Sequence, residues 1–326
     1  MDITAWSESI PLAKPFAISR GVRTHCDIVR VKICYRSHVA LGECTPYLRY
    51  GESVESVLEQ IQQEIPRLNT LPPKEAKTKL QGMSAGAARN ALDCALWDLM
   101  ANEDGLHFPS PYFDIRSKME TAITVSIDTP EKMARQAKEY VSQGATLLKV
   151  KLDNRQILPR VTAVRQAAPK SKIILDANEA WQNESLTTLF QALHTLNITM
   201  IEQPVPKGYD HMLKGIPHPI PLCADESCHT SDDLTKLEGC YEMINIKLDK
   251  SGGLTEAIAL DQQARAKGFH IMVGCMLGTS LAMKAALPIA TRADIVDLDG
   301  PVLLGTDILD CLKYQSGTLG LDKKIK

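Results

Sequence analysis

The sequence predicts an α/β protein that folds as a modified TIM barrel, (β/α)7β, with an α+β capping domain at the N-terminus. In the second half of the chain, eight short segments rich in apolar and β-branched residues start about 25 residues apart, and stretches with helical spacing separate them. The first third lacks this rhythm and shows strand-like and helix-like patterns in separate blocks. A chain of 326 residues also suits two domains.

The barrel prediction depends on the order of the segments. Strands that alternate with helices pair in parallel through crossovers, and eight strands with seven helices between them favour a barrel. Gly144 and Gly268 follow the helical stretches 130–143 and 254–267 as stop signals. An open doubly wound sheet is the alternative, disfavoured because no glycine-rich dinucleotide turn follows the first strand. The predicted strands are residues 120–125, 147–151, 172–176, 199–202, 221–225, 243–247, 270–274 and 293–297.

The change of pattern sets the domain boundaries. We expect residues 1–115 to form the capping domain and residues 116–301 the barrel that carries the catalytic residues. Residues 302–326 follow the eighth strand, and we expect them to return to the cap. The predicted cap contains a hairpin, two helices, the second N-capped by Ser84, and a loop between the helices. The hairpin strands are residues 28–35 and 39–43, the helices are residues 53–65 and 84–101, and the loop is residues 71–77.

Charge and cysteine content narrow the function classes. The 37 basic and 39 acidic residues leave a net charge of -2, which lacks the basic footprint of a general nucleic-acid binder. No apolar run reaches the ~18 residues of a membrane span, and the N-terminus shows no signal-peptide pattern. The nine cysteines include no pair with the two-residue gap of a zinc or redox motif. We therefore expect a cytoplasmic protein with free, mostly buried thiols and neither nucleic-acid nor membrane partners.

Three consecutive predicted strands end in a carboxylate, namely Asp176, Glu202 and Asp225. In a barrel of this type the carboxyl ends of the strands face the active site. Three carboxylates in one pocket need a counter-charge, and oxygen-only ligands favour a hard cation such as Mg²⁺. No histidine lies at these strand ends, which argues against zinc.

Lysines end strands on both sides of this acidic arc. Lys149 and Lys151 lie two residues apart on one strand and so project to the same face. Because two ammonium groups that close disfavour each other's charge, we expect lysine pKa values below the usual value of about 10.4. Lys247 ends a strand four positions further round and should face Lys151 across the mouth. Two bases on opposite sides of one carbon suit removal of a proton from one face and its return to the other.

Eight segments of the chain resemble the enolase superfamily, in its muconate-lactonizing subgroup. The likeness extends from about residue 10 to residue 301. Within that superfamily the chain is most similar to bacterial L-Ala-D/L-Glu epimerases, a narrower likeness that rests mainly on DLDGP and the cap. The segments are LLKVKLDN (147–154), ILDANE (174–179), IEQP (201–204), CADES (223–227), INIKLDKSGGLTEA (244–257), DLDGP (297–301), GECTPYLRYGES (42–53) and SAGAARNALDCALWDL (84–99).

The resemblance implies a role for each strand-end residue. The catalytic acid/base pair would be Lys151 and Lys247, and Lys149 would hold the substrate carboxylate. Thr124 and the backbone of Cys275 would line the substrate site. The ligands of one Mg²⁺ per subunit would be Asp176, Glu202 and Asp225.

Two further sites would bind the ends of a dipeptide. By the resemblance, Asp297 and Asp299 would bind the α-ammonium group of its N-terminal residue, and an acidic pair at the eighth strand suits such a cation on chemical grounds too. A cap arginine would bind the glutamate side chain. Both Arg20 and Arg23 are candidates, and Arg23 is preferred because it precedes Thr24 in a family-like pair.

The resemblance thus implies an isomerase that epimerises the glutamyl α-carbon of L-Ala-D/L-Glu through an enolate, in the recycling of murein peptides. Its partner would be a small dipeptide, and a homo-oligomer is compatible with the family. Two alternatives stay open. One is another reaction of the superfamily, a β-elimination such as o-succinylbenzoate synthesis or a cycloisomerisation, which would leave the acidic pair unexplained. The other is a non-catalytic, metal-stabilised interaction protein, which would not need lysines that face each other.

Overall fold

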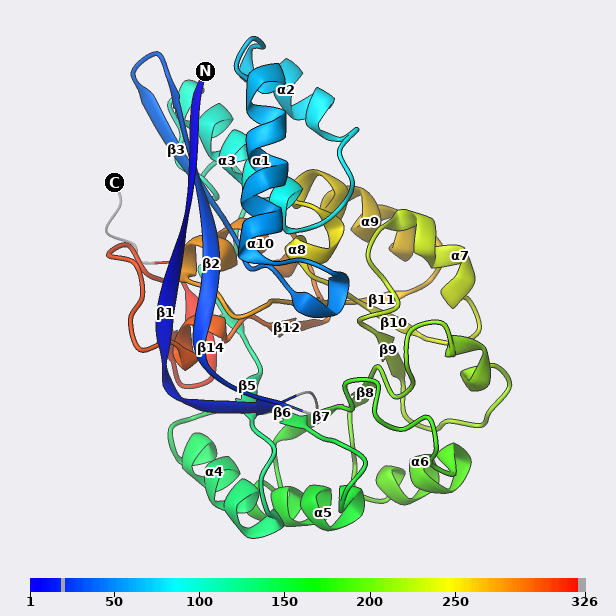
Figure 1. Ribbon diagram of the computed structural model, residues 1–326. Coiled ribbons are helices and arrows are strands. Elements are labelled where there is room, and N and C mark those ends of the chain that lie inside the picture. The colour runs from blue at the N-terminus through cyan, green and yellow to red at the C-terminus, as the bar shows by residue number, and fades with distance from the viewer. Residues whose placement is uncertain (19–20, 322–326) are drawn as a thin grey trace.

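The computed structural model describes residues 1–18 and 21–321, with residues 16–18 described by their backbone only. The predicted barrel with an α+β cap is confirmed: eight parallel strands form a ring, and a separate antiparallel sheet with its own helices forms the cap (Figure 1). None of the helices in these ranges is long and apolar enough to cross a membrane. All nine cysteines are free, and six of them are buried.

The ring strands follow one another in chain order, and every neighbouring pair is parallel. A backbone hydrogen bond of 2.8 Å from Ala122 N to Val296 O joins the first strand to the last and closes the ring. The strands are β5 (Ile123–Val125), β6 (Leu147–Lys151), β7 (Lys172–Asp176), β8 (Met200–Glu202), β9 (Leu222–Ala224), β10 (Met243–Ile246), β11 (His270–Gly274) and β12 (Ile295–Asp297).

Helices connect the strands on the outside of the ring (Figure 1). Gly144 and Gly268 have φ values of 98° and 86° after their helices, as the stop signals predicted. One connection differs, because β8 and β9 are joined only through the 3-10 turn η2 (Asp210–Leu213), in a stretch rich in proline and glycine that cannot continue a helix. The helices are α4 (Pro130–Ser142), α5 (Ile157–Ala167), α6 (Leu186–His194), α7 (Leu234–Leu237) after η3 (Ser231–Asp233), α8 (Leu248–Ser251), α9 (Leu254–Ala266) and α10 (Ser280–Ala290).

The first predicted strand divides into two. β4 (Lys118–Glu120) leaves the ring and pairs with β14 (Thr318–Gly320), which pairs with β13 (Lys313–Gln315) in a small antiparallel sheet. The C-terminal segment also meets the cap. After η4 (Gly300–Leu303), Leu304 forms a bridge with Leu12, and Gly305 N donates a 2.7 Å hydrogen bond to Pro11 O.

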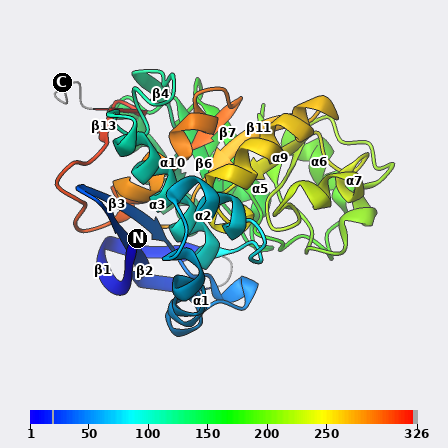
Figure 2. The same cartoon turned by 90° about the horizontal axis from the view of Figure 1, so that it is seen from above.

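The cap sheet contains β1 (Asp2–Ile18), β2 (Gly21–Tyr35) and β3 (His38–Cys44), all antiparallel. The 3-10 turn η1 (Leu48–Tyr50) and the helices α1 (Val54–Leu68), α2 (Pro73–Leu80) and α3 (Ala87–Glu103) follow. In the view from above, β1, β2 and α1 lie on one side of the barrel (Figure 2).

Three details of the cap differ from the sequence prediction. β1 was not predicted, because Pro11 and Pro15 interrupt its pattern and its register with β2 shifts there. The predicted loop at 71–77 is largely helix α2, since Pro73 occupies the first helical position, where proline is tolerated. Gly86, not Ser84, precedes α3.

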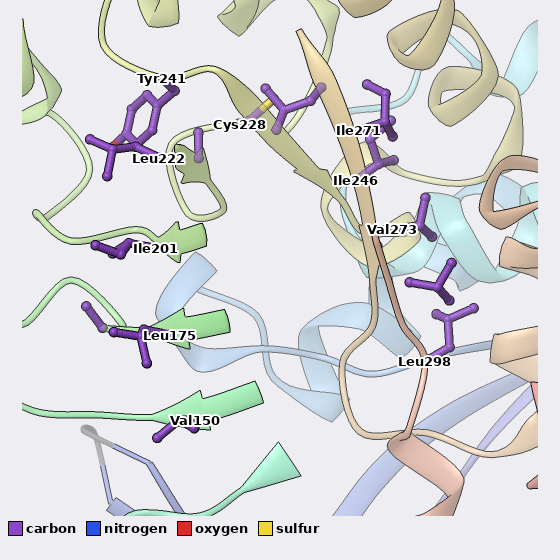
Figure 3. Packing of buried hydrophobic residues seen from close by; sticks show 14 of the residues in the cluster. Val150, Leu175, Ile201, Leu222, Cys228, Tyr241, Ile246, Ile271, Val273 and Leu298 are labelled. Atoms are coloured by element: carbon purple, nitrogen blue, oxygen red, sulfur yellow. The ribbon is translucent and has the colours of Figure 1, made fainter. Parts of the chain in front are cut away.

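Two hydrophobic layers hold the barrel together. An inner layer at its base includes Leu147, Ile174 and Met200, and an outer layer packs between the strands and the helices. Figure 3 shows residues of the outer layer, among them Val150 and Leu175. The alternation of inner and outer residues fixes which side chains reach the interior of the ring.

Candidate active site

The alternation of side chains brings charged residues into the ring above the inner apolar layer. On β6, Leu148 and Val150 belong to the outer layer and Leu147 to the inner one. Lys149 and Lys151 therefore share the inner face with Leu147, one step nearer the mouth each time. The same alternation turns Asp176 inward on β7.

Lys149 lies at the centre of the charged cluster. Its Nζ is 2.6 Å from Glu202 Oε2, 2.8 Å from Asp297 Oδ2 and 3.1 Å from Asp176 Oδ2. The side chain is only 2% exposed. Burial alone would lower the pKa of Lys149, but the charges of the three carboxylates outweigh it and hold the pKa well above its usual value.

The two proposed bases sit on either side of this centre. Lys151 Nζ lies 2.6 Å from Asp176 Oδ2, and Lys247 Nζ lies 2.7 Å from Asp225 Oδ2. Lys151 ends β6, and Lys247 directly follows β10, four strands further round the ring. The two lysines thus approach the same cavity from opposite walls, as the sequence predicted.

The expected lowering of the lysine pKa is wrong for Lys149, and the pKa of Lys247 is raised as well. Burial lowers the pKa of Lys247, but the charges of Asp225 and Glu202 outweigh it and raise the pKa above its usual value. The prediction considered the repulsion between lysines. The attraction of the neighbouring carboxylates, whose contacts with the ammonium groups form only in the folded ring, is the stronger effect.

The three strand-end carboxylates have different pKa shifts. Burial raises the pKa of each, but lysine charges outweigh it at Asp176 and Asp225, so both pKa values lie well below the usual range. At Glu202, burial and the charge of Asp176 dominate over Lys149 and raise the pKa to about 7. Negative charge at Glu202 is therefore not fully compensated by the lysines.

These carboxylates fit a hard divalent cation. They offer only oxygen atoms, from neighbouring strands, and such an ion would neutralise the charge of Glu202 that the lysines leave uncompensated. Within the part of the chain that the structure describes, no group of three or more acidic, histidine or cysteine side chains has the spacing of a formed metal site. Asp176, Glu202 and Asp225 each lie instead against a lysine ammonium group.

Sequence reasoning missed two residues behind the carboxylates. Asn245 Nδ2 donates a 2.8 Å hydrogen bond to Glu202 Oε1. Lys250 is fully buried, with Nζ 2.7 Å from Asp225 Oδ1 and hydrogen bonds to the backbone oxygens of Cys228 and Asn245. Asn245 could have been found from its position two residues before Lys247, on the same face of the strand. No local pattern marks Lys250.

Asp297 ends β12 and Asp299 follows two residues later, at the strand end where the acidic pair was expected. Asp297 Oδ2 contacts Lys149, and its buried Oδ1 has no hydrogen-bond partner among the described residues. Asp299 Oδ2 accepts a 2.8 Å hydrogen bond from Thr124 N. Burial and the charge of Asp297 raise the pKa of Asp299 to about 7. Thr124 and Cys275 line the same cavity as the pair.

Among the described residues, the cap contributes one arginine and two tyrosines to the wall of the cavity. Arg23, on β2, lines the cavity with Tyr47 and Tyr50 from around η1. The space is about 710 Å³ including its open mouth, a size that suits a small molecule. Arg20, the other candidate arginine, falls outside the described residues. Both tyrosines were missed, since they belong to an irregular turn.

Family models match both parts of the chain. Residues 132–302 match the model described as enolase C-terminal domain-like. Residues 1–108 match the N-terminal domain of the mandelate racemase/muconate lactonizing enzymes.

Two curated relatives extend over most of the chain. An L-Ala-D/L-Glu epimerase from Escherichia coli K12 is 46% identical and covers 98% of this chain and 99% of its own length. An N-acetyl-D-glutamate racemase from Pseudoalteromonas sp is 43% identical, covering 90% of this chain and 92% of its own length.

Two solved structures share the fold and contain ligands. An enolase family member from Agrobacterium tumefaciens with homology to dipeptide epimerases, with bound sodium and L-Ala-L-Glu, has a TM-score of 0.92 and 43% identity, covering 98% of each chain. A dipeptide epimerase from Cytophaga hutchinsonii, complexed with Mg and D-Ala-L-Val, has a TM-score of 0.88 and 27% identity, covering 99% of this chain and 96% of its own.

Proposed function

This chain belongs to the enolase superfamily, in the mandelate racemase/muconate lactonizing enzyme group, and is a dipeptide epimerase; we propose that it inverts the glutamyl α-carbon of L-Ala-D/L-Glu by a two-base proton transfer. The observation that carries the mechanism is the opposed pair of lysines. Lys151 and Lys247 come from strands four positions apart in the ring and line one cavity.

The charges around the cavity match those of an acidic dipeptide. The ammonium group of the N-terminal residue would lie against Asp297 and Asp299, where one buried carboxylate oxygen has no hydrogen-bond partner among the described residues. The α-carboxylate would lie beside Lys149. Arg23, from the cap, would hold the glutamyl side chain. The one cavity thus offers acidic side chains for the ammonium group and basic side chains for the two carboxylates.

Asp176, Glu202 and Asp225 would hold one Mg²⁺, as the oxygen-only donor set favours. When bound, the ion would neutralise charge on the substrate carboxylate and so make the α-proton easier to remove. The structure of the Cytophaga hutchinsonii epimerase, which contains Mg, supports this assignment.

The proton transfer itself would be carried out by the lysines. One lysine, in its neutral form, takes the α-proton from one face, and the other, in its ammonium form, donates a proton to the opposite face. Lys149, which contacts Asp297 as well as two of the proposed metal ligands, would keep its ammonium form and stabilise the negative charge of the enolate. Lys151 and Lys247 each contact a carboxylate, so that ion pair must open before either lysine acts as a base.

A second candidate function is racemisation of an N-acylated glutamate. The Pseudoalteromonas relative named an N-acetyl-D-glutamate racemase, at 43% identity, favours it. An N-acyl group carries no positive charge, however, so such a substrate would bring no cation to the Asp297–Asp299 pair. We therefore place the dipeptide first.

The cellular role follows from the substrate. L-Ala-D/L-Glu is a dipeptide of the cell-wall peptide, so we propose that the enzyme serves murein peptide recycling. Nine free cysteines suit the reducing cytoplasm.

Deuterium uptake in D₂O tests the proposal directly. The enzyme is incubated with Mg²⁺ and a library of dipeptides and N-acyl amino acids, and mass spectrometry records the gain of one deuterium. We expect L-Ala-L-Glu and L-Ala-D-Glu to exchange fastest. Faster exchange into N-acetylglutamate would favour the second function, and no exchange into any compound would contradict both.

A further inference from the structure

We propose that Tyr47 is a positioning residue that holds Arg23 over the cavity and so selects dipeptides with an acidic C-terminal side chain. The inference rests on the proposed function, because it concerns which dipeptides the same cavity prefers. It adds a residue outside the reacting centre that acts on the substrate only through Arg23.

The contact between the two side chains carries the inference. The guanidinium carbon of Arg23 lies 5.0 Å from the centroid of the Tyr47 ring, within the range of a cation–π interaction. Both residues are half-buried and line the cavity. An arginine side chain has many rotamers, so a ring beneath its guanidinium group removes much of the freedom that binding would otherwise have to restrict.

The Tyr47 ring is itself supported. It lies 5.2 Å from the Tyr50 ring, and Tyr50 meets the edge of the His229 ring at 4.6 Å with an interplanar angle of 73°. These rings form a row, Tyr47–Tyr50–His229, that crosses from the cap to the barrel loop after β9. Burial and nearby lysine charges lower the pKa of His229 to about 4, so its ring is neutral near pH 7.

The backbone of Tyr47 is fixed separately from its side chain. Tyr47 N donates a 3.1 Å hydrogen bond to Glu52 Oε2. Glu52 Oε1 accepts a 2.8 Å hydrogen bond from Ala87 N at the start of α3. A change of the Tyr47 side chain should therefore remove the support of Arg23 while the turn stays attached to the helix.

The charge of Arg23 remains available for a ligand. Lys149, Lys151 and Lys247 each contact a carboxylate of the ring, whereas no ion pair joins Arg23 to a carboxylate in the part of the chain that the structure describes. A guanidinium group held by an aromatic ring keeps its charge and its hydrogen-bond donors free for an anion. An acidic substrate side chain is the complementary group.

The test compares L-Ala-L-Glu with the nearly isosteric but uncharged L-Ala-L-Gln. For Tyr47→Leu we expect KM for L-Ala-L-Glu to rise roughly fivefold to tenfold, and the preference for Glu over Gln in kcat/KM to fall by the same factor. Tyr47→Phe keeps the ring and should retain the preference. Tyr50→Leu, which removes the next ring, should give a smaller shift in the same direction.

Two variants complete the experiment. Arg23→Met should abolish the preference, and adding Tyr47→Leu to it should change the preference no further. Tyr209→Leu, at an exposed tyrosine that does not line the cavity, is the matched control. Circular dichroism checks that each variant is folded.

The outcomes separate this inference from the proposed function. If Tyr47→Leu lowered kcat/KM equally for both substrates, Tyr47 would have a merely structural role and the inference would be overturned. A wild-type enzyme that epimerises both dipeptides equally well would overturn it too, while the epimerase function would stand. A wild-type enzyme that epimerises neither would contradict the proposed function itself.

Discussion

The barrel and the cap contribute different kinds of residue to one cavity. The barrel supplies charged side chains that are almost completely buried and paired with one another, such as Lys149 with Glu202. The cap supplies half-buried residues that meet through ring contacts, namely Arg23 on β2 and Tyr47 and Tyr50 around a short turn. On the barrel side of the cavity, close ion pairs hold the charged side chains to one another.

This difference suggests a division of labour. Chemistry at a carbon atom needs groups held to within a fraction of an ångström, and strand ends in a closed ring provide that precision. Recognition of a side chain tolerates more movement, and a turn on a separate domain can change without disturbing the ring. Changes in the barrel should therefore reduce the rate for every substrate, and changes in the cap should alter substrate preference.

The largest effect is expected from the opposed lysines. Lys151→Ala and Lys247→Ala should each lower epimerisation by about 10³-fold or more, because a turnover needs both a base and an acid. Each variant should still exchange the α-proton of one glutamyl epimer in D₂O, and by the family resemblance Lys151 would serve the D-epimer and Lys247 the L-epimer. NMR of the α-proton in L-Ala-L-Glu and L-Ala-D-Glu measures this.

The control for that experiment is Lys172→Ala, at an exposed lysine that begins β7 and pairs with Glu120. It should behave as wild type. If either Lys151→Ala or Lys247→Ala retained full epimerisation, the two-base mechanism would be wrong.

The next effect concerns the metal. Removal of Mg²⁺ by EDTA should abolish activity, and added Mg²⁺ should restore it. Asp225→Asn should weaken Mg²⁺ binding at least about tenfold in calorimetry, since it removes a charged ligand. Asp128→Asn, at an exposed aspartate paired with Lys132, is the control. Full activity after rigorous chelation would show that the reaction does not need the metal.

A smaller effect should follow when the ammonium group of the substrate is blocked. N-acetyl-L-Ala-L-Glu should have a kcat/KM lower than that of the free dipeptide by roughly 1–3 kcal/mol, about 5- to 150-fold, because the buried acidic pair loses its partner. Asp297→Asn should narrow this gap. Equal values for the two compounds with the wild-type enzyme would show that the acidic pair has another role.

The last prediction leaves activity aside and concerns stability, where the cap meets the barrel. Burial and the charges of Glu52 and Glu43 raise the pKa of Asp249 to about 7, despite hydrogen bonds from Thr45 N and Asn90 Nδ2. The folded chain thus binds a proton that the unfolded chain releases at about pH 4. The free energy of unfolding should fall as pH rises from about 4 to 7, by at most about 1.4 kcal/mol per pH unit, and level off above.

Asp249→Asn tests this pH dependence. The amide oxygen can accept both hydrogen bonds and carries no charge, so the variant should lose this part of the slope and be more stable than wild type at pH 8. Urea denaturation between pH 5 and pH 8 measures both. If the free energy of unfolding changed with pH in the same way for both proteins, Asp249 would not be the source of the pH dependence.

The same comparison explains what could be predicted from the sequence. The strand rhythm predicted the ring, and the strand ends predicted which charged residues meet, because parallel strands place their carboxyl ends together. The individual contacts between side chains of different strands could not be predicted. The role of Lys250 and the raised pKa of Lys149 were therefore missed. In the cap, Tyr47 and Tyr50 follow no periodic pattern. Strand β1 and helix α2 were not predicted, because their prolines interrupt the patterns typical of a strand and of a helix.

Asp299 has a consequence for how such enzymes diverge. Its carboxylate holds Thr124 N across the point where the ring closes, next to the backbone bond between Ala122 and Val296. Asp299, which is proposed to bind the substrate, therefore also stabilises the closure of the ring. A descendant that exchanged Asp299 to accept an uncharged group would weaken this closure, so a change of substrate at this position would require a second, compensating mutation where the ring closes.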